Sequence, residues 1–240
     1  MISKVYKLNE LKNYKYVVVM SEYDGKILLS RHKDRTTWET QGGHVEQGET
    51  PLEAAKRELY EESGATEYEI TPLCDYWAGA PETGKGANDM IFTAKITKLS
   101  PIPESEMAEV RTFDTLPKNL TYPAITPVIF AKKDIGKEVT VTVDRKLGTY
   151  HPKHNDIFYT VNYGYIEGII GGDGEEQDAY ILGINEPVDS FTGIIKAVIH
   201  RFDDIENKWV VCPKDYNITE EGIIKQVDFQ EKYFQSCIII

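Results

Sequence analysis

The chain has 240 residues and a formal net charge of −12, and 41% of its residues are hydrophobic, with a mean hydropathy of −0.40. At roughly 100–200 residues per domain, this length fits one large domain or two small ones, and the composition is typical of a soluble globular protein. The acidic balance excludes a protein that binds nucleic acid through a basic surface. It does not exclude a small anionic substrate, because bound cations invert the local charge.

The cysteines and the apolar runs give further expectations about the compartment. Cys74, Cys212 and Cys237 are far apart and form no CxxC pair, which favours reduced thiols over disulfides or a zinc cluster. The polar residues 1–16 lack the apolar core of a signal peptide. No apolar run approaches the roughly 20 residues that cross a bilayer. We therefore expect a cytoplasmic protein without a membrane partner.

The first half of the chain alternates strand-like and helix-like segments. Two β-rich runs, Tyr16–Met20 and Lys26–Ser30, flank an Asp24-Gly25 turn signal and predict an antiparallel hairpin. Further along we expect strands at 68–72 and 90–96, an acidic loop at 101–109 and a helix at 121–131. The short charged stretch 131–138 then marks a domain boundary.

A helix over residues 50–62 has clear signals at both ends. Thr50 is a predicted N-cap, Pro51 occupies the first helical position and Glu53 completes a capping box. Gly64 lies just past the end, where a left-handed cap is expected.

The pattern changes after the boundary. Short strand-like runs are separated by turns rich in Gly and Asp, and they lie at 139–143, 159–165, 179–184, 192–200 and 208–211. Closely spaced short strands predict a small barrel or sandwich.

Three glutamates form the first chemical pattern. Glu58, Glu61 and Glu62 stand at i, i+3 and i+4 of the predicted helix, so their side chains are neighbours on one face. Three like charges this close call for a cation, and Mg²⁺, which takes oxygen ligands and shares substrate phosphates, fits this role. Arg57 is placed to pair with Glu49 and fix the glycine-containing loop against the helix. A merely solvated acidic helix face is the alternative.

The offsets resemble the Nudix box, GX5EX7REUXEEXGU. The matching positions are Gly43, Glu49, Arg57, Glu58, Leu59, Glu61, Glu62 and Gly64, and Ala65 stands at the final hydrophobic position. The resemblance extends over about residues 14–132. It implies that Glu58, Glu61 and Glu62 hold Mg²⁺, with Mn²⁺ as a substitute, and that Glu61 and Arg57 belong to the catalytic group. It also implies cleavage of a nucleoside diphosphate-type substrate into a nucleoside monophosphate and pyrophosphate or phosphate.

The other roles in such a site are less clearly encoded. Glu109 is the first candidate for the general base, with Glu106 second, and an acidic surface loop is the alternative for both. Gly43 and Trp38 are candidates for substrate contact, although Trp38 is equally suited to a core. MutT-like enzymes of this family often carry an asparagine for purine contact near the last helix, where this sequence has Thr126.

A second acidic pattern lies in the C-terminal half. Asp173, Glu175 and Asp178 follow a Gly-Gly turn, and Asp204 and Glu206 lie in a predicted hairpin turn. If the barrel brings the two turns together, five carboxylates would meet and require a divalent metal. Solvated hairpin tips are the alternative. Phosphate donors available nearby are Tyr163, Lys208, Tyr233, Arg145 and Lys153.

This half resembles the single-barrel soluble inorganic pyrophosphatases. The YTVNYGY run at 159–165 and the GDGEEQDAYIL run at 172–182 carry the resemblance. It departs from that family where Glu175 and Glu206 stand in place of aspartates. Asp173, Glu175, Asp178, Asp204 and Glu206 would then be metal ligands, and Tyr163, Lys208 and Tyr233 would contact phosphate.

The sequence therefore predicts an α+β protein with two domains. Residues 1–133 would form a Nudix α/β/α sandwich with a mixed sheet, and residues 134–240 a small OB-like β-barrel. One hypothesis is a Mg²⁺-dependent hydrolase that converts nucleoside triphosphates to monophosphates and pyrophosphate, coupled to pyrophosphate hydrolysis by the second domain. One alternative is a Nudix hydrolase whose second domain is non-catalytic and either binds a phosphate ligand or makes the protein a homodimer. The other is a nucleotide-sensing regulator without turnover. The expected partner is a nucleotide or pyrophosphate, with no nucleic acid.

Overall fold

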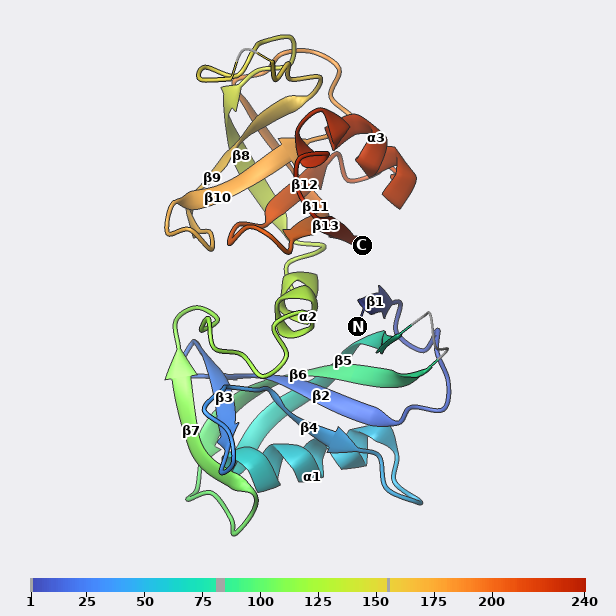
Figure 1. Cartoon of the computed structure of the whole chain (residues 1–240), viewed down its shortest axis with the longest axis vertical. Coiled ribbons are helices and arrows are strands. Elements are labelled where there is room, and N and C mark those ends of the chain that lie inside the picture. The colour runs from blue at the N-terminus through green and yellow to red at the C-terminus, as the bar shows by residue number, and fades with distance from the viewer. Residues whose placement is uncertain (1, 81–84, 155) are drawn as a thin grey trace. The chain divides into compact units, whose positions relative to one another are not determined.

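The computed structural model describes residues 2–80, 85–154 and 156–240, and it divides the chain into two compact units, Met1–Phe130 and Ala131–Ile240 (Figure 1). The sequence placed this boundary between residues 133 and 134. We describe each unit by itself.

A mixed β-sheet is the centre of the first unit (Figure 1). Its described strands run in the order β1-β5-β6-β2-β3-β7, and β4 pairs with the free part of β2. The pair β2–β6 is parallel and the other pairs are antiparallel. The strands are β1 (Ile2–Tyr6), β2 (Tyr16–Tyr23), β3 (Lys26–His32), β4 (Gln41–His44), β5 (Ala65–Ala80), β6 (Lys85–Leu99) and β7 (Met107–Phe113).

One helix covers each face of this sheet. Val17 and Val19 of β2 pack with Leu59 of α1 (Pro51–Ser63) in one core cluster. Met20 of the same strand packs with Ile129 of α2 (Thr126–Lys132) in another. Because successive strand residues point to opposite faces, the alternation along β2 directs its apolar side chains to both layers. The expected α/β/α sandwich with a mixed sheet is confirmed.

Local sequence signals act as expected at two points. Asp24 and Gly25 both have positive φ angles, 55° and 74°, in the turn between β2 and β3, as a two-residue hairpin turn of the I′ kind requires. The α1 helix has Thr50 as N-cap with a complete capping box and Pro51 at its start. Gly64 ends it with a φ of 75°.

Three expectations for the first unit need correction. The acidic segment 101–109 is not a loop throughout, because Met107–Phe113 forms β7 along the edge of β3. The helix expected at 121–131 begins only at Thr126. Strands β1 and β4 were not expected. The Gly-Gly pair in β4 has low strand propensity, and pairing with β2 overrides it.

The second unit is a small barrel. The described strands run in the order β12-β10-β9-β8-β11-β13, and a further β11–β12 pairing closes five of them into a ring. Gly164 permits the close approach of β9 and β8, because a Cβ there would lie 1.9 Å from the Thr142 carbonyl oxygen. The strands are β8 (Glu138–Arg145), β9 (Asn162–Ile170), β10 (Glu176–Ile181), β11 (Ser190–Arg201), β12 (Lys208–Cys212) and β13 (Ser236–Ile239).

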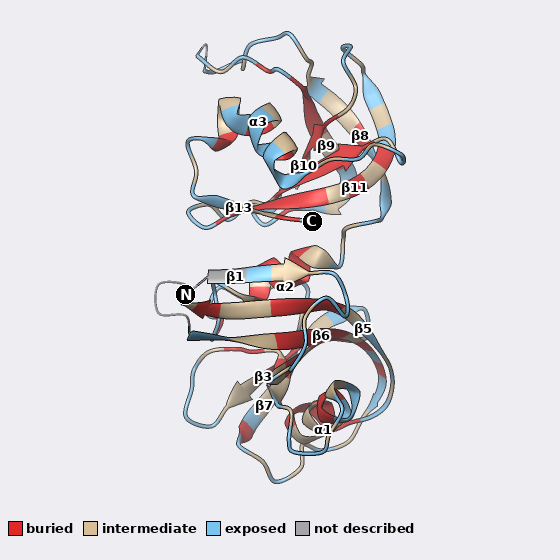
Figure 2. Cartoon of the chain, turned by 90° about the vertical axis from the view of Figure 1, so that its right-hand side faces the viewer, coloured by how far each residue is buried: buried red, intermediate tan, exposed pale blue. Residues whose placement is uncertain are grey.

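Helix α3 (Glu220–Glu231) packs against the barrel, with Ile223 and Val227 in the same buried cluster as Tyr163 and Tyr180 (Figure 2). The expected small barrel is confirmed, whereas α3 and β13 were not expected. In the described part of the chain, no helix is long and apolar enough to span a membrane.

Candidate active site

Arg57 joins the loop before α1 to the helix itself. Its Nε and Nη2 atoms donate to the two carboxylate oxygens of Glu49 at 2.8 and 3.0 Å, and Nη2 also donates to the His44 carbonyl oxygen at 3.0 Å. This paired geometry is the strong arginine–carboxylate arrangement. It holds the pKa of Glu49 down to about 2, so the loop is fixed by a permanent ion pair.

The same guanidinium reaches two of the three helix glutamates. Nη1 donates to Glu58 at 2.8 Å and to Glu61 at 3.3 Å. Burial nevertheless raises the pKa of Glu58, with Arg57 opposing the shift. Glycine at position 43 leaves room for the Glu58 carboxylate, because a Cβ at that position would lie 2.2 Å from Glu58 Oε1. The sequence motif therefore brings together Gly43, Glu49, Arg57, Glu58 and Glu61.

Glu62 lies on the buried side of α1. Its Oε2 accepts the backbone N–H of Gly42 at 2.8 Å, and the residue is only 6% exposed. Burial, aided by the nearby charges of Glu58, Glu39 and Glu106 and opposed by the Gly42 N–H, raises the pKa of Glu62 to about 9. Without a cation beside it, Glu62 is therefore protonated at neutral pH.

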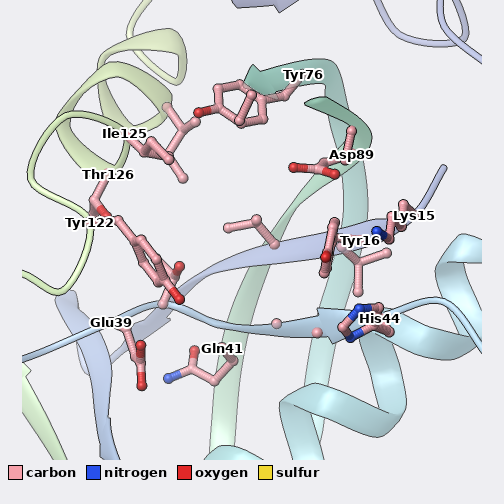
Figure 3. A pocket seen from close by; sticks show the side chains of 18 of the residues that line it. Lys15, Tyr16, Glu39, Gln41, His44, Tyr76, Asp89, Tyr122, Ile125 and Thr126 are labelled. Atoms are coloured by element: carbon pink, nitrogen blue, oxygen red, sulfur yellow. The ribbon is translucent and has the colours of Figure 1, made fainter. Parts of the chain in front are cut away.

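A pocket of about 940 Å³ opens beside Glu62 on the α2 side of the sheet (Figure 3). Its walls come from β2, β4, β5, β6 and the start of α2. The carboxylates of Glu39, Glu62, Asp89 and Glu106 line it together with aromatic and apolar side chains. The principal lining residues are Lys15, Tyr16, Glu39, Gln41, His44, Tyr76, Asp89, Glu106, Tyr122, Ile125 and Thr126.

The two candidate bases have different surroundings. Arg31 donates to one oxygen of Glu109 at 3.0 Å and Arg111 to the other at 2.5 Å, and these bonds lower the pKa of Glu109. Glu106 lines the pocket and lies 3.2 Å from His32 Nε2. Both oxygens of Glu109 are thus already engaged, whereas Glu106 faces the pocket.

The candidate substrate-contact residues lie in different places. Thr126 lines the pocket at the first turn of α2. Trp38 is 5% exposed and packs against Phe113 with ring centroids 5.0 Å apart, in a core cluster with Leu29 and Leu120. Trp38 therefore belongs to the core.

The carboxylates fit a hard divalent cation in their chemistry. Within residues 2–80, 85–154 and 156–240, no group of three or more His, Cys, Asp or Glu side chains is arranged to hold a metal ion as it stands. Mg²⁺ in phosphate-processing sites uses only one or two carboxylates, with waters and substrate phosphates completing its shell. The raised pKa values of Glu58 and Glu62 show a surplus of negative charge that such a cation would neutralise.

Comparison with known families assigns most of the first unit to one family. The model of the NUDIX domain matches residues 13–125, which contain α1, its loop and all the pocket-lining residues except Thr126 and Ile129 of α2. Residues 13–125 are a Nudix domain. The Nudix family generally uses a divalent metal, in accord with the carboxylate set.

Individual relatives match only parts of the chain. YtkD of Bacillus subtilis, whose name proposes 8-oxo-dGTP diphosphatase activity, is 36% identical over 110 residues, which are 45% of this chain and 66% of that protein. An RNA pyrophosphohydrolase of Bartonella henselae is 32% identical over 69 residues, 25% of this chain and 40% of that enzyme. The crystal structure of a Bacillus subtilis pyrophosphohydrolase has 28% identity and a TM-score of 0.48, covering 55% of this chain and 89% of that one.

The barrel carries a separate cluster of charged side chains. Lys208 Nζ donates to Asp178 at 2.6 Å and also to Glu206, and the Tyr163 hydroxyl donates to Asp178. Burial raises the pKa of Glu206 to about 7. The pKa of Asp178 is lowered, because Lys208 and Tyr163 outweigh the effect of its burial. Four of the predicted C-terminal site residues thus meet at one place.

Two of the other predicted ligands, Asp173 and Asp204, have hydrogen-bond partners outside this cluster. The two turns do come together, since a Cβ on Gly172 would lie 1.9 Å from the Ile205 carbonyl oxygen. Asp173 accepts the Glu175 backbone N–H, and Asp204 accepts from Arg201 at 2.9 Å. The expected meeting of five carboxylates is therefore not seen among the described residues. Tyr233 follows α3 and is more than half exposed, with Lys232 over its ring.

Two donors beside the Lys208 cluster are buried without partners. Arg145 Nε and the Tyr159 hydroxyl make no hydrogen bond to any described residue. The Arg145 guanidinium lies 5.0 Å from the centroid of the Tyr163 ring, and its charge interacts with Tyr159. Buried donors are nearly always satisfied, so this side of the cluster has the character of an anion site.

Proposed function

We propose that this protein is a divalent-metal-dependent hydrolase that cleaves the diphosphate bond of a nucleoside triphosphate, releasing a nucleoside monophosphate and pyrophosphate. The observation that carries the proposal is the Arg57-centred carboxylate cluster, which borders Gly43, a residue that lines a nucleotide-sized pocket together with Glu62. The relatives' names, RNA pyrophosphohydrolase and putative 8-oxo-dGTP diphosphatase, agree with this reaction class.

Each residue of the cluster would have a distinct role in this reaction. Glu58, Glu61 and Glu62 would hold Mg²⁺, or Mn²⁺ in its place, and a bound divalent cation polarises phosphoryl oxygens and lowers the pKa of water. Arg57 orients Glu58 and Glu61 and fixes the loop through Glu49. The Gly42–Gly43 backbone lies against the carboxylates without side chains in the way.

We assign the general base to Glu106 in preference to Glu109. A base must accept a proton within reach of the reacting water, and Glu106 faces the pocket. Glu109 would keep its two arginines in place and act as a structural residue of β7.

The test is a turnover screen of the full chain with Mg²⁺ or Mn²⁺. The panel contains nucleoside triphosphates, 8-oxo-dGTP, a nucleotide sugar, ADP-ribose and a 5′-triphosphorylated oligonucleotide, and phosphate is measured with and without added pyrophosphatase. A nucleoside monophosphate as product supports the proposal. Absence of turnover on every compound contradicts it and favours a nucleotide sensor.

For the barrel we propose binding of phosphate or pyrophosphate. The unpartnered donors of Arg145 and Tyr159 beside Lys208 support this assignment. The resemblance to inorganic pyrophosphatases extends the proposal to hydrolysis with metal ligands among Asp173, Glu175, Asp178, Asp204 and Glu206. Because Lys208 occupies the space between Asp178 and Glu206, we favour the non-catalytic binding module.

A full-length Glu61→Gln variant distinguishes the activity of the barrel from that of the Nudix domain. Its impaired Nudix site leaves any pyrophosphate turnover to the barrel, and Lys208→Met in the same background is the matched control. Calorimetric binding of pyrophosphate without turnover, lost in the Lys208→Met protein, is the expected result. Turnover of pyrophosphate that disappears with Lys208→Met would establish a second catalytic site instead.

A further inference from the structure

One buried carboxyl group in the Nudix pocket is not needed for the chemistry at the phosphates. Asp89 of β6 is 6% exposed, and its Oδ1 has no hydrogen-bond partner among the described residues. Burial raises the pKa of this carboxyl group to about 7, and the Tyr16 backbone N–H and the charge of Lys15 oppose the shift. Figure 3 shows this carboxyl group directed into the pocket. Since buried oxygens are rarely left unpaired, the open side of Asp89 indicates a donor on a ligand.

The strand register places the Tyr16 ring next to Asp89 and the His44 ring one strand further away on the same face. Tyr16 of β2 pairs with Asp89 on one side and with His44 of β4 on the other, so the three side chains project from one face of the sheet. The Tyr16 and His44 ring centroids are 4.3 Å apart. Lys15 Nζ lies over the Tyr16 ring at 5.3 Å. A planar aromatic group could therefore stack beside Tyr16 and His44 with its edge toward Asp89.

The distance to the carboxylate cluster suits a nucleotide. Strands β4 and β6 flank β2 on opposite sides, so Asp89 lies two strand spacings, roughly 10 Å, from the Gly42–His44 segment. Glu62 and Glu58 contact that segment at Gly42 and Gly43. A nucleotide whose phosphates lie at the carboxylates would reach Asp89 with its base.

We propose that Asp89 is a specificity-determining residue that accepts the N1–H and N2–H groups of a guanine-type base stacked beside Tyr16 and His44. An ionised carboxylate only accepts hydrogen bonds, and guanine offers two adjacent N–H donors on one edge. Adenine presents a ring nitrogen lone pair next to its amino group, which repels a carboxylate. This inference rests on the proposed nucleotide hydrolysis, because it places the base of the substrate in the same pocket.

The test compares wild type, Asp89→Asn and Asp75→Asn. Asp75 is a matched control: it is fully buried and also has an unpartnered Oδ1, but its other oxygen accepts from Leu11 and Tyr14 outside the pocket. We would measure kcat/KM for GTP and ATP with Mg²⁺, and GMP and AMP binding by calorimetry. Melting temperatures confirm that each variant is folded.

Hydrogen bonds to a charged group are worth a factor of about 10–100 in binding, so wild type should favour GTP over ATP and GMP over AMP by that factor. Asp89→Asn should remove most of this preference by weakening the guanine compounds alone, and Asp75→Asn should keep it. Equal loss on both bases, an unchanged ratio, or the same loss in Asp75→Asn would overturn the proposal. If GMP binds through Asp89 but no nucleotide is hydrolysed, the proposed function fails and the base assignment stands.

Discussion

Replacing Glu62 by glutamine should remove the pH dependence that this residue gives to the stability of the Nudix domain. The carboxyl group is buried against the Gly42 backbone N–H, and its burial raises the pKa from 4.5 to about 9. The folded state therefore holds the proton more tightly than the unfolded chain does. The resulting stabilisation is complete below about pH 4.5 and is lost as the pH rises through about 9.

The magnitude follows from the linkage relation. Each pH unit within this window changes the free energy of unfolding by about 1.4 kcal/mol, so metal-free wild type should lose up to about 4 kcal/mol between pH 5 and pH 8. Glutamine keeps an oxygen for the Gly42 N–H but never ionises, so Glu62→Gln should not show this loss.

Scanning calorimetry in the presence of a chelator measures the difference. We expect similar melting temperatures for the two proteins at pH 5 and a higher value for Glu62→Gln at pH 8, by about 10 °C. Mg²⁺ should raise the wild-type value at pH 8 and leave that of the variant nearly unchanged. Parallel pH curves for wild type and variant would refute the assignment of a buried, cation-seeking carboxyl group at this position.

Four further substitutions test the parts of the site. Arg57→Ala should lower kcat/KM by about 100-fold, because Glu58 and Glu61 lose their common anchor; steady-state kinetics measures this, and a change below threefold would contradict it. Gly43→Ala should lower kcat by about 10- to 100-fold with little change in melting temperature, because only the Glu58 carboxylate must move; a collapse in stability instead would mean that the backbone is displaced. Glu106→Gln should lower kcat by about 100-fold or more, whereas Glu109→Gln should change it little; the reverse order would return the base to Glu109.

The Nudix half was predictable from sequence to the extent that its signals are local. The cap residues around α1 and the Asp24-Gly25 turn act through their own backbone, so they were visible in the chain. Strand β4 was missed because the Gly42-Gly43 pair has poor strand propensity and is held only by its partner β2. Strand β7, which begins within the acidic segment 101–109, is also not predictable from the local sequence, because it is held by its pairing with β3.

The site residues also divide into those placed by local sequence and those placed by tertiary contacts. Glu58, Glu61, Glu62 and Arg57 lie at fixed offsets on one helix, and the spacing brings them together in any structure that forms the helix. Asp89 comes from a different strand, and only the β2–β6 register places it beside Tyr16. A polar residue at the start of an apolar run was its only signal in the sequence.

In the barrel, the closeness of the two acidic turns does not by itself determine which carboxylates contact one another. The two acidic turns meet as the sequence suggested, but Arg201 holds Asp204 and the turn backbone holds Asp173. Arg201 is buried, with Glu231 of the unexpected helix α3 as its second partner. Pairings of this kind depend on tertiary contacts and are not encoded in the spacing of the acids.

The central claim is that the glutamates of α1 support cleavage of a nucleoside diphosphate bond. The most direct measurement is turnover of the best substrate of the panel by wild type and Glu61→Gln in Mg²⁺, with Glu67→Gln, a surface carboxylate paired with Lys98, as the control. We predict release of a nucleoside monophosphate by wild type and the control, and a loss of about 100-fold or more in Glu61→Gln. A Glu61→Gln protein with the wild-type rate would contradict the claim.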